Sequence, residues 1–125
     1  MKLGHAFAVS IVGICFAMSS ASAGQGEQSN INFLARMDQA RLNKAARMAG
    51  DLIGVMERCR LNPTEDGKAI MAVPVLLYHG LEKHLTPDTR KFQSAAHAYE
   101  RAFAMAVQRA GNCKTEKAKY PNLYR

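Results

Sequence analysis

The chain has 125 residues, of which 48% are hydrophobic and 22% are charged. This length accommodates one domain and excludes an assembly of several. The 17 lysines and arginines outnumber the 10 aspartates and glutamates, which gives a net charge of +7, and the absence of tryptophan disfavours a platform that stacks on sugars.

The first 23 residues have the organisation of a cleavable secretory signal. Lys2 precedes an apolar run over residues 6–18, and residues 21–23 (Ala-Ser-Ala) provide the small side chains that a signal peptidase recognises. The apolar run is shorter than the ~20 residues that a membrane-spanning helix needs. We therefore predict cleavage before Gly24 and export, with the mature protein periplasmic or secreted.

Residues 24–30 form a polar lead that contains glycine, and we predict that this lead is disordered. A first helix is predicted from Phe33 to Cys59, because apolar residues recur there at steps of three and four. Gly50 and Gly54 each cost this helix about 1 kcal/mol relative to alanine. Either a close contact with another helix compensates for that cost, or the helix is locally weak. Several charged residues lie off the apolar stripe and can stay hydrated: Arg36, Arg41, Arg47, Asp51 and Arg58.

Residues 62–65 (Asn-Pro-Thr-Glu) predict the start of a second helix, since they combine a cap, a proline suited to the first helical position and a glutamate suited to a capping box. Pro74 lies within this helix and lacks a backbone N–H. We therefore expect either one kinked helix or two short ones. The alternative is a strand over residues 73–78, which are rich in strand-forming side chains.

Residues 86–89 (Thr-Pro-Asp-Thr) repeat the cap and proline signal and open a third helix, whose apolar stripe runs from Phe92 to Ala110. Gly111 is predicted to end it, because glycine readily takes the left-handed conformation of a helix terminus. Residues 114–125 are basic and lack a helical period. We expect them to form a flexible tail, or to pack along the surface.

Two of the three cysteines remain after the predicted cleavage. Cys15 would leave with the signal, whereas Cys59 and Cys113 stay, and a pair of cysteines in an oxidising compartment favours a disulfide over two separate thiols. Such a bond would stabilise the fold by roughly 4 kcal/mol in the chain-entropy model. It would join the C-terminal ends of the first and last long helices, which should then run parallel. We predict an all-α fold, a compact three- to four-helix bundle over residues 31–113.

No motif in the chain marks a catalytic centre, a cofactor site or a metal site. His79 and His84 are five residues apart and do not share a helix face, and the two cysteines provide too few ligands for zinc. Tyr78 and His79 lie near Glu82 and could exchange protons near neutral pH, but no paired nucleophile is marked. We therefore predict that the protein is not an enzyme. The least favoured alternative is a hydrolase whose activity depends on His79.

Two resemblances can be stated, and neither assigns a residue role. Residues 72–79 (Ala-Val-Pro-Val-Leu-Leu-Tyr-His) resemble a Pro-Val-Leu-x-Tyr-His segment of polysaccharide deacetylases, but the Asp-Asp pair and the His-x-x-x-His motif of that family have no counterpart here. In size and cysteine use, the chain is similar to periplasmic acid-stress chaperones and to immunity proteins against cell-wall-cleaving effectors.

The composition favours a binding function. Net positive charge attracts anionic partners, and thioether side chains suit adaptable apolar surfaces, which draws attention to Met37, Met48, Met56, Met71 and Met105. We predict that the protein binds another envelope protein, as an inhibitor, immunity factor, chaperone or accessory subunit. The alternative is a structural protein that contacts anionic lipid or cell-wall polymer. Nucleic acid is not an expected partner outside the cytosol, and homo-oligomerisation is left open.

The predicted binding residues follow the helix interruption at Pro74, since an irregular segment could be exposed. They are Tyr78, His79, Lys83 and His84.

Overall fold

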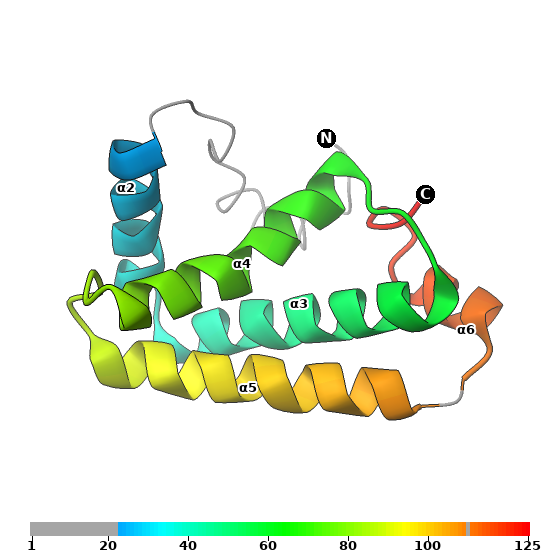
Figure 1. Cartoon of the computed structure of the whole chain (residues 1–125). Coiled ribbons are helices and arrows are strands. Elements are labelled where there is room, and N and C mark those ends of the chain that lie inside the picture. The colour runs from blue at the N-terminus through cyan, green and yellow to red at the C-terminus, as the bar shows by residue number, and fades with distance from the viewer. Residues whose placement is uncertain (1–22, 110) are drawn as a thin grey trace.

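The computed structural model describes residues 23–109 and 111–125, so the predicted signal lies outside the described residues up to Ser22. Within the described ranges the ordered elements are helices, and the predicted all-α class is confirmed. Figure 1 shows their arrangement. They are α2 (Ala23–Arg36), α3 (Gln39–Cys59), α4 (Glu65–Glu82), α5 (Thr89–Gln108) and α6 (Cys113–Lys119).

The two longest helices, α3 and α5, lie side by side and run in the same direction (Figure 1). Near their first residues, Nε2 of Gln39 donates to the carbonyl oxygen of Lys91 over 3.1 Å. Near their last residues, Nη1 of Arg58 donates to the carbonyl oxygen of Val107 over 2.7 Å. The parallel orientation predicted from the cysteine positions is therefore confirmed.

Gly50 and Gly54 of α3 lie where this helix meets the backbone of α5. A Cβ atom built on Gly50 would come 2.5 Å from the carbonyl oxygen of Tyr99. One built on Gly54 would come 2.6 Å from Cβ of Ala106. Real Cβ atoms do not approach other atoms this closely. The close helix contact, rather than local weakness, is therefore what accounts for the two glycines.

α4 returns the chain in the direction opposite to α3 and α5 and packs on both of them (Figure 1). Pro74 is buried inside α4, which continues through it as a single helix with a visible bend. A proline removes one hydrogen bond and pushes the preceding turn outward, which explains a bend without a break. Of the predicted alternatives, the kinked helix is correct, and the strand over residues 73–78 is wrong.

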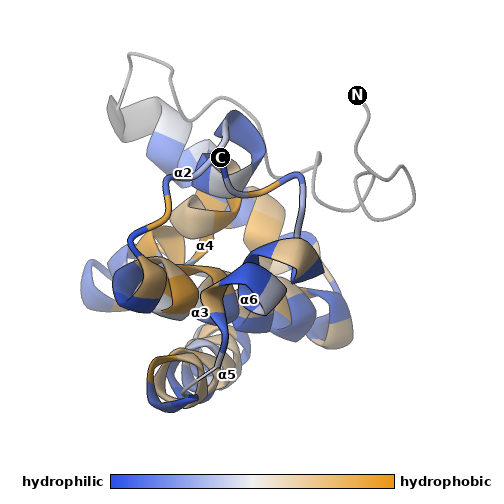
Figure 2. Ribbon diagram, turned by 90° about the vertical axis from the view of Figure 1, so that its right-hand side faces the viewer, coloured by the Kyte–Doolittle hydropathy of each residue, from blue (hydrophilic) through white to orange (hydrophobic). Residues whose placement is uncertain are grey.

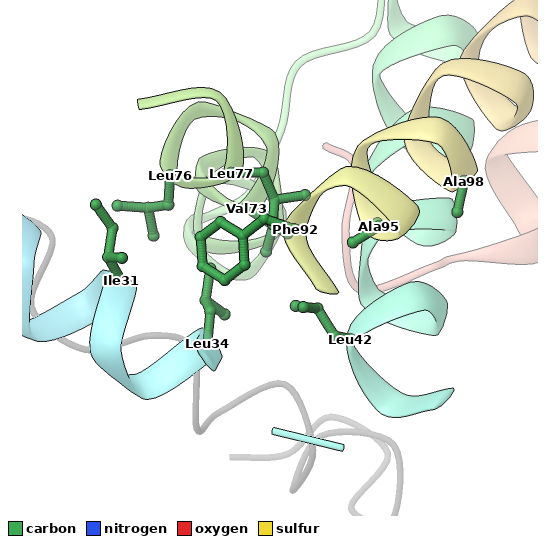
Figure 3. Packing of buried hydrophobic residues seen from close by; sticks show 10 residues of the cluster. Ile31, Leu34, Leu42, Val73, Leu76, Leu77, Phe92, Ala95 and Ala98 are labelled. Carbon is green, nitrogen blue, oxygen red and sulfur yellow. The ribbon is translucent and has the colours of Figure 1, made fainter. Parts of the chain in front are cut away.

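Buried apolar side chains form two clusters. The first lies around Phe92 (Figure 3), where side chains of α2, α3, α4 and α5 meet: Ile31, Leu34, Leu42, Val73, Leu76, Leu77 and Ala95. Ala98 belongs to the same cluster further along α5. The second lies toward the C-terminal end of α3 and includes Met48, Leu52, Val55, Ile70, Leu123 and Tyr124. Figure 2 shows the consequence, because hydrophobic colour concentrates between the helices and hydrophilic colour on their outer faces.

The predicted first helix is in fact two helices, and the predicted disorder of residues 24–30 is wrong, because they belong to α2. Asp38 separates the helices, since its Oδ1 accepts a backbone N–H from the first turn of α3 over 3.0 Å. The last carbonyls of α2 are satisfied by Lys91 of α5, whose Nζ donates to Ala35 and to Met37, each over 2.7 Å.

Each of the two cap-and-proline patterns correctly predicts a helix. In both cases the observed helix starts later than the pattern indicates. The cap of α4 is Thr64, and the cap of α5 is Asp88; each side chain accepts the N–H three residues further on. The proline therefore precedes the cap in both cases and does not occupy the first helical position. For α4 the cause is tertiary, because Pro63 is held extended by an isolated β-bridge with Tyr124.

Residues 114–125 pack on the protein and are not a flexible tail. After α6, the chain crosses the start of α4, where the backbone N–H of Thr64 donates to the carbonyl oxygen of Leu123 over 3.0 Å. The N–H of Arg125 donates to the carbonyl oxygen of Asn62 over 2.7 Å. Leu123 and Tyr124 are 2% and 3% exposed, so this segment completes the second cluster.

The predicted disulfide between Cys59 and Cys113 is present, with the two Cα atoms 5.7 Å apart. Its position differs in one respect from the prediction. α5 ends at Gln108, before Gly111, and Cys113 is the first residue of α6. The bond therefore fixes α6 to the end of α3.

We predict that Gly50→Ala destabilises the protein, although alanine is the better helix former. Overpacking against the α5 backbone should outweigh the gain of about 1 kcal/mol in helix propensity and leave a net loss of about 1–2 kcal/mol in the free energy of unfolding. Urea denaturation followed by circular dichroism measures this loss. Glu57→Ala is the control, since Glu57 is exposed on the same helix. A Gly50→Ala protein as stable as the parent would contradict the close contact.

Candidate functional site

His79 and Lys83, two of the predicted binding residues, both contact Glu27 of α2. Nδ1 of His79 pairs with Oε2 of Glu27, and Nζ of Lys83 lies 3.8 Å from Oε1 of the same carboxylate. The hydrogen bond from His79 lowers the pKa of Glu27. These contacts link α4 to α2 beside the first apolar cluster, so they help to hold α2 in place.

Tyr78 and His84, the other two predicted residues, have different surroundings. The hydroxyl of Tyr78 donates to the carboxylate of Glu100 on α5, and its ring meets that of Tyr99 edge-on with the centroids 6.3 Å apart. Burial, with Glu100 beside the hydroxyl, raises the pKa of Tyr78. His84 is exposed just after α4, with a φ of 55°. The four residues do not converge on one site, and their role in binding stays a prediction.

A groove of about 480 Å³ lies between α3 and α5, away from these residues. From α3 it is lined by Lys44, Arg47, Met48 and Asp51. From α5 it is lined by Ala98, Arg101, Ala102 and Met105. In both helices the spacing is three, four and seven residues, so each set occupies one helix face. We call this feature the α3–α5 groove.

The floor of the α3–α5 groove is apolar. Ala98 and Met48 are 3% and 8% exposed, whereas Met105 on α5 is 65% exposed. Leaving so much of a methionine in water is unfavourable, and covering it would favour the bound state. Met105 therefore offers a ligand apolar contact in addition to charge.

Three cations surround this floor without a partner. Lys44, Arg47 and Arg101 are exposed, and in residues 23–109 and 111–125 none of them has an ion pair or a side-chain hydrogen bond. Cations that share one groove repel each other, and an anion placed among them relieves that repulsion. The electrostatic character of the groove thus suits a ligand with several negative charges.

A network of fixed charges closes the end of the groove at Arg109. Its Nη2 lies 2.9 Å from Oδ1 of Asp51 and 2.7 Å from Oε1 of Glu116, and its Nε donates to Oε2 of Glu116 over 3.0 Å. The hydrogen bond from Arg109 lowers the pKa of Glu116. Tyr120 lines the same end, and burial raises its pKa to about 12. Unlike the three exposed cations, Arg109 is already neutralised.

Sequence reasoning missed the α3–α5 groove because it treated the two helices separately. It placed Arg47 and Asp51 off the apolar stripe as hydrated residues and did not single out Arg101. The available signal was the repeated spacing of basic and small apolar residues in both segments. This spacing indicates a site only when the register of the two helices is known to bring the two faces together.

We predict that Glu116→Gln lowers stability more at neutral pH than in acid. Because the folded-state pKa of Glu116 lies below its ordinary value of 4.5, its ionised form stabilises the fold above that pH. This contribution is lost as the pH falls through the lower, folded-state pKa. The difference in unfolding free energy between parent and variant should therefore shrink from pH 7 toward the acid limit of the native state. A difference independent of pH would contradict the role given to the Arg109 ion pair.

Where the chain is described, no three histidine, cysteine, aspartate or glutamate side chains gather to hold a metal ion. None of the helices from Ala23 onward is both long and apolar enough to cross a membrane. No protein-family model, curated protein or solved structure matches the chain. The function is therefore inferred from the geometry of the α3–α5 groove itself.

Proposed function

We propose that the protein is an exported, non-enzymatic binding protein whose α3–α5 groove holds an acidic segment of another envelope protein. The observation that carries this proposal is the set of three unpartnered cations, Lys44, Arg47 and Arg101, around an apolar floor. Complementary charge brings partners together and selects among them, while apolar burial adds affinity. An inhibitor, an immunity factor, a chaperone or an accessory subunit would each use such a site.

The shape of the groove favours a protein segment over a membrane surface. Ala98 and Met48 on the floor are almost fully buried, and they lie between the two helices that carry the cations. A flat lipid surface would meet the exposed cations first and could not enter the recess between them. A protruding protein segment can fill it. Contact with anionic lipid or cell-wall polymer through the same cations is the alternative.

Export is supported by two features. Disulfides form and persist in oxidising compartments outside the cytosol, and Cys59 and Cys113 are bonded. The predicted cleavage before Gly24 falls at the first residues of α2, well before Ile31, where its core contacts begin. Removal of the signal would leave both apolar clusters intact.

The binding proposal predicts that reversing two groove charges weakens binding. The probe is a fluorescein-labelled peptide of glutamate and leucine of about twelve residues, long enough to follow the groove. Arg47→Glu with Arg101→Glu should raise its dissociation constant at least tenfold in fluorescence anisotropy, a loss of about 1.4 kcal/mol or more. The matched control is Arg41→Glu with Arg90→Glu, which makes the same charge change on the same two helices outside the groove. It should bind within about twofold of the parent.

Equal weakening in both double variants would show general attraction between opposite charges and overturn the α3–α5 groove as the site. Phosphatidylglycerol vesicles distinguish the alternative. Vesicle binding that exceeds peptide binding and depends on Arg47 and Arg101 would favour the lipid-contacting protein. Circular dichroism should show the same helix content in both variants, because all four arginines are exposed.

The export proposal predicts the mass of the mature protein. When the full chain is expressed in a bacterium with a general secretory pathway, intact-mass measurement of the periplasmic fraction should give a chain that begins at Gly24. Because the bond between Cys59 and Cys113 removes two hydrogens, the mass should rise by that amount on reduction. A chain that retains residues 1–23 in the cytosol, with both thiols free, would contradict export.

A further inference from the structure

We infer that the acidic segment held by the α3–α5 groove is an amphipathic α-helix, with carboxylates on both flanks of an apolar stripe. This inference rests on the proposed function, and it adds the conformation of the partner. Three properties of the groove support it: the backbone groups available to a bound chain, the side chains of the lining, and the length of the lining.

The groove lacks what an extended peptide requires. Addition of a β-strand needs a sheet edge with unsatisfied backbone groups, and in the described residues the only β-type pairing is the isolated bridge of Pro63 with Tyr124. The walls are the interiors of α3 and α5, where backbone groups already bond within each helix. A polyproline segment would need a wall of aromatic rings, whereas Tyr120 is the one aromatic residue of the lining.

The lining instead matches a helix. Ala102 is small and half-buried, so a partner helix can approach it closely, while Met105 provides flexible, exposed apolar surface beside it. The lining extends from Lys44 to Asp51 on α3 and from Ala98 on α5 to Arg109 just beyond its end, which corresponds to about 10 and 16 Å along the helix axes. An occupant of two to three helical turns fits this length.

The position of the groove in the bundle also suits a helix. At 100° per residue, Lys44 and Arg47 of α3 are turned by about 150° from Leu42 and Ala49, which belong to the clusters that α4 joins. A helix in the groove would therefore pack on the α3–α5 pair from the side opposite α4. It would add a further helix to the bundle and cover Met105.

Charge excludes two other occupants. A second copy of this protein that used the same groove would bring three further cations against Lys44, Arg47 and Arg101. Residues 1–22 of the chain contain no aspartate or glutamate, so they cannot supply the carboxylates. The occupant is thus a segment of a different protein, with glutamate or aspartate on either side of leucine-like residues.

The test compares two peptides that differ only in their ability to form a helix. The first is the all-L peptide Ac-EELLEELLEELLEE-NH2, labelled with fluorescein. The second has the same sequence with two central leucines in the D configuration, which keeps charge and composition but disrupts the helix. We expect the all-L peptide to bind at least tenfold more tightly to the full mature, disulfide-bonded protein. Its helical circular dichroism should increase on binding, and Arg47→Glu with Arg101→Glu should abolish the difference between the peptides.

The outcomes separate this inference from the proposed function. If both peptides bind equally and both are weakened by the groove double variant, acidic segments bind there and the helix is overturned. If neither peptide binds more tightly than its lysine analogue, in which lysine replaces each glutamate, the proposed function and the helix are both overturned. Unchanged binding in the groove double variant places the site elsewhere and also overturns the inference.

Discussion

The close approach of the α3 and α5 backbones is the constraint on which the rest of the structure depends. Gly50 and Gly54 permit it, because a Cβ atom at either position would force α5 to shift. Because two rigid helices in close contact have one register, this contact also decides which side chains share a surface. It sets Arg47 and Arg101 on the two walls of one groove, and it brings Arg58 to the end of α5.

Two sets of basic residues have different physical roles. Lys91 and Arg58 donate to carbonyls at the ends of α2 and α5, so each completes the terminus of a helix other than its own. This suits the partial negative charge at a helix C-terminus. Lys44, Arg47 and Arg101 make no such contact among the residues described. The overall charge is thus a poor guide to function here, whereas the three exposed cations that share the groove are informative.

Much of the fold could be predicted from sequence because it depends on local periodicity and on one covalent link. The apolar stripes predict the long helices, and pairing Cys59 with Cys113 predicts that α3 and α5 run parallel. The prediction fails where tertiary contacts decide. Asp38 divides an apparently continuous stripe, and Pro63 precedes α4 because Tyr124 holds it extended. The groove could not be predicted either. Each of its walls, taken alone, has the residue pattern of an ordinary hydrated helix face.

The burial of Leu123 and Tyr124 in the same cluster as Leu52 gives the protein an order of assembly. A chain that is made from its amino end presents α3 long before the residues that cover it. Contacts across such a separation form late, since a long loop must close first. Cys59 must therefore remain a free thiol until its partner, 54 residues further along the chain, is present. The bond between α3 and α6 can therefore close only after the chain has been made as far as Cys113.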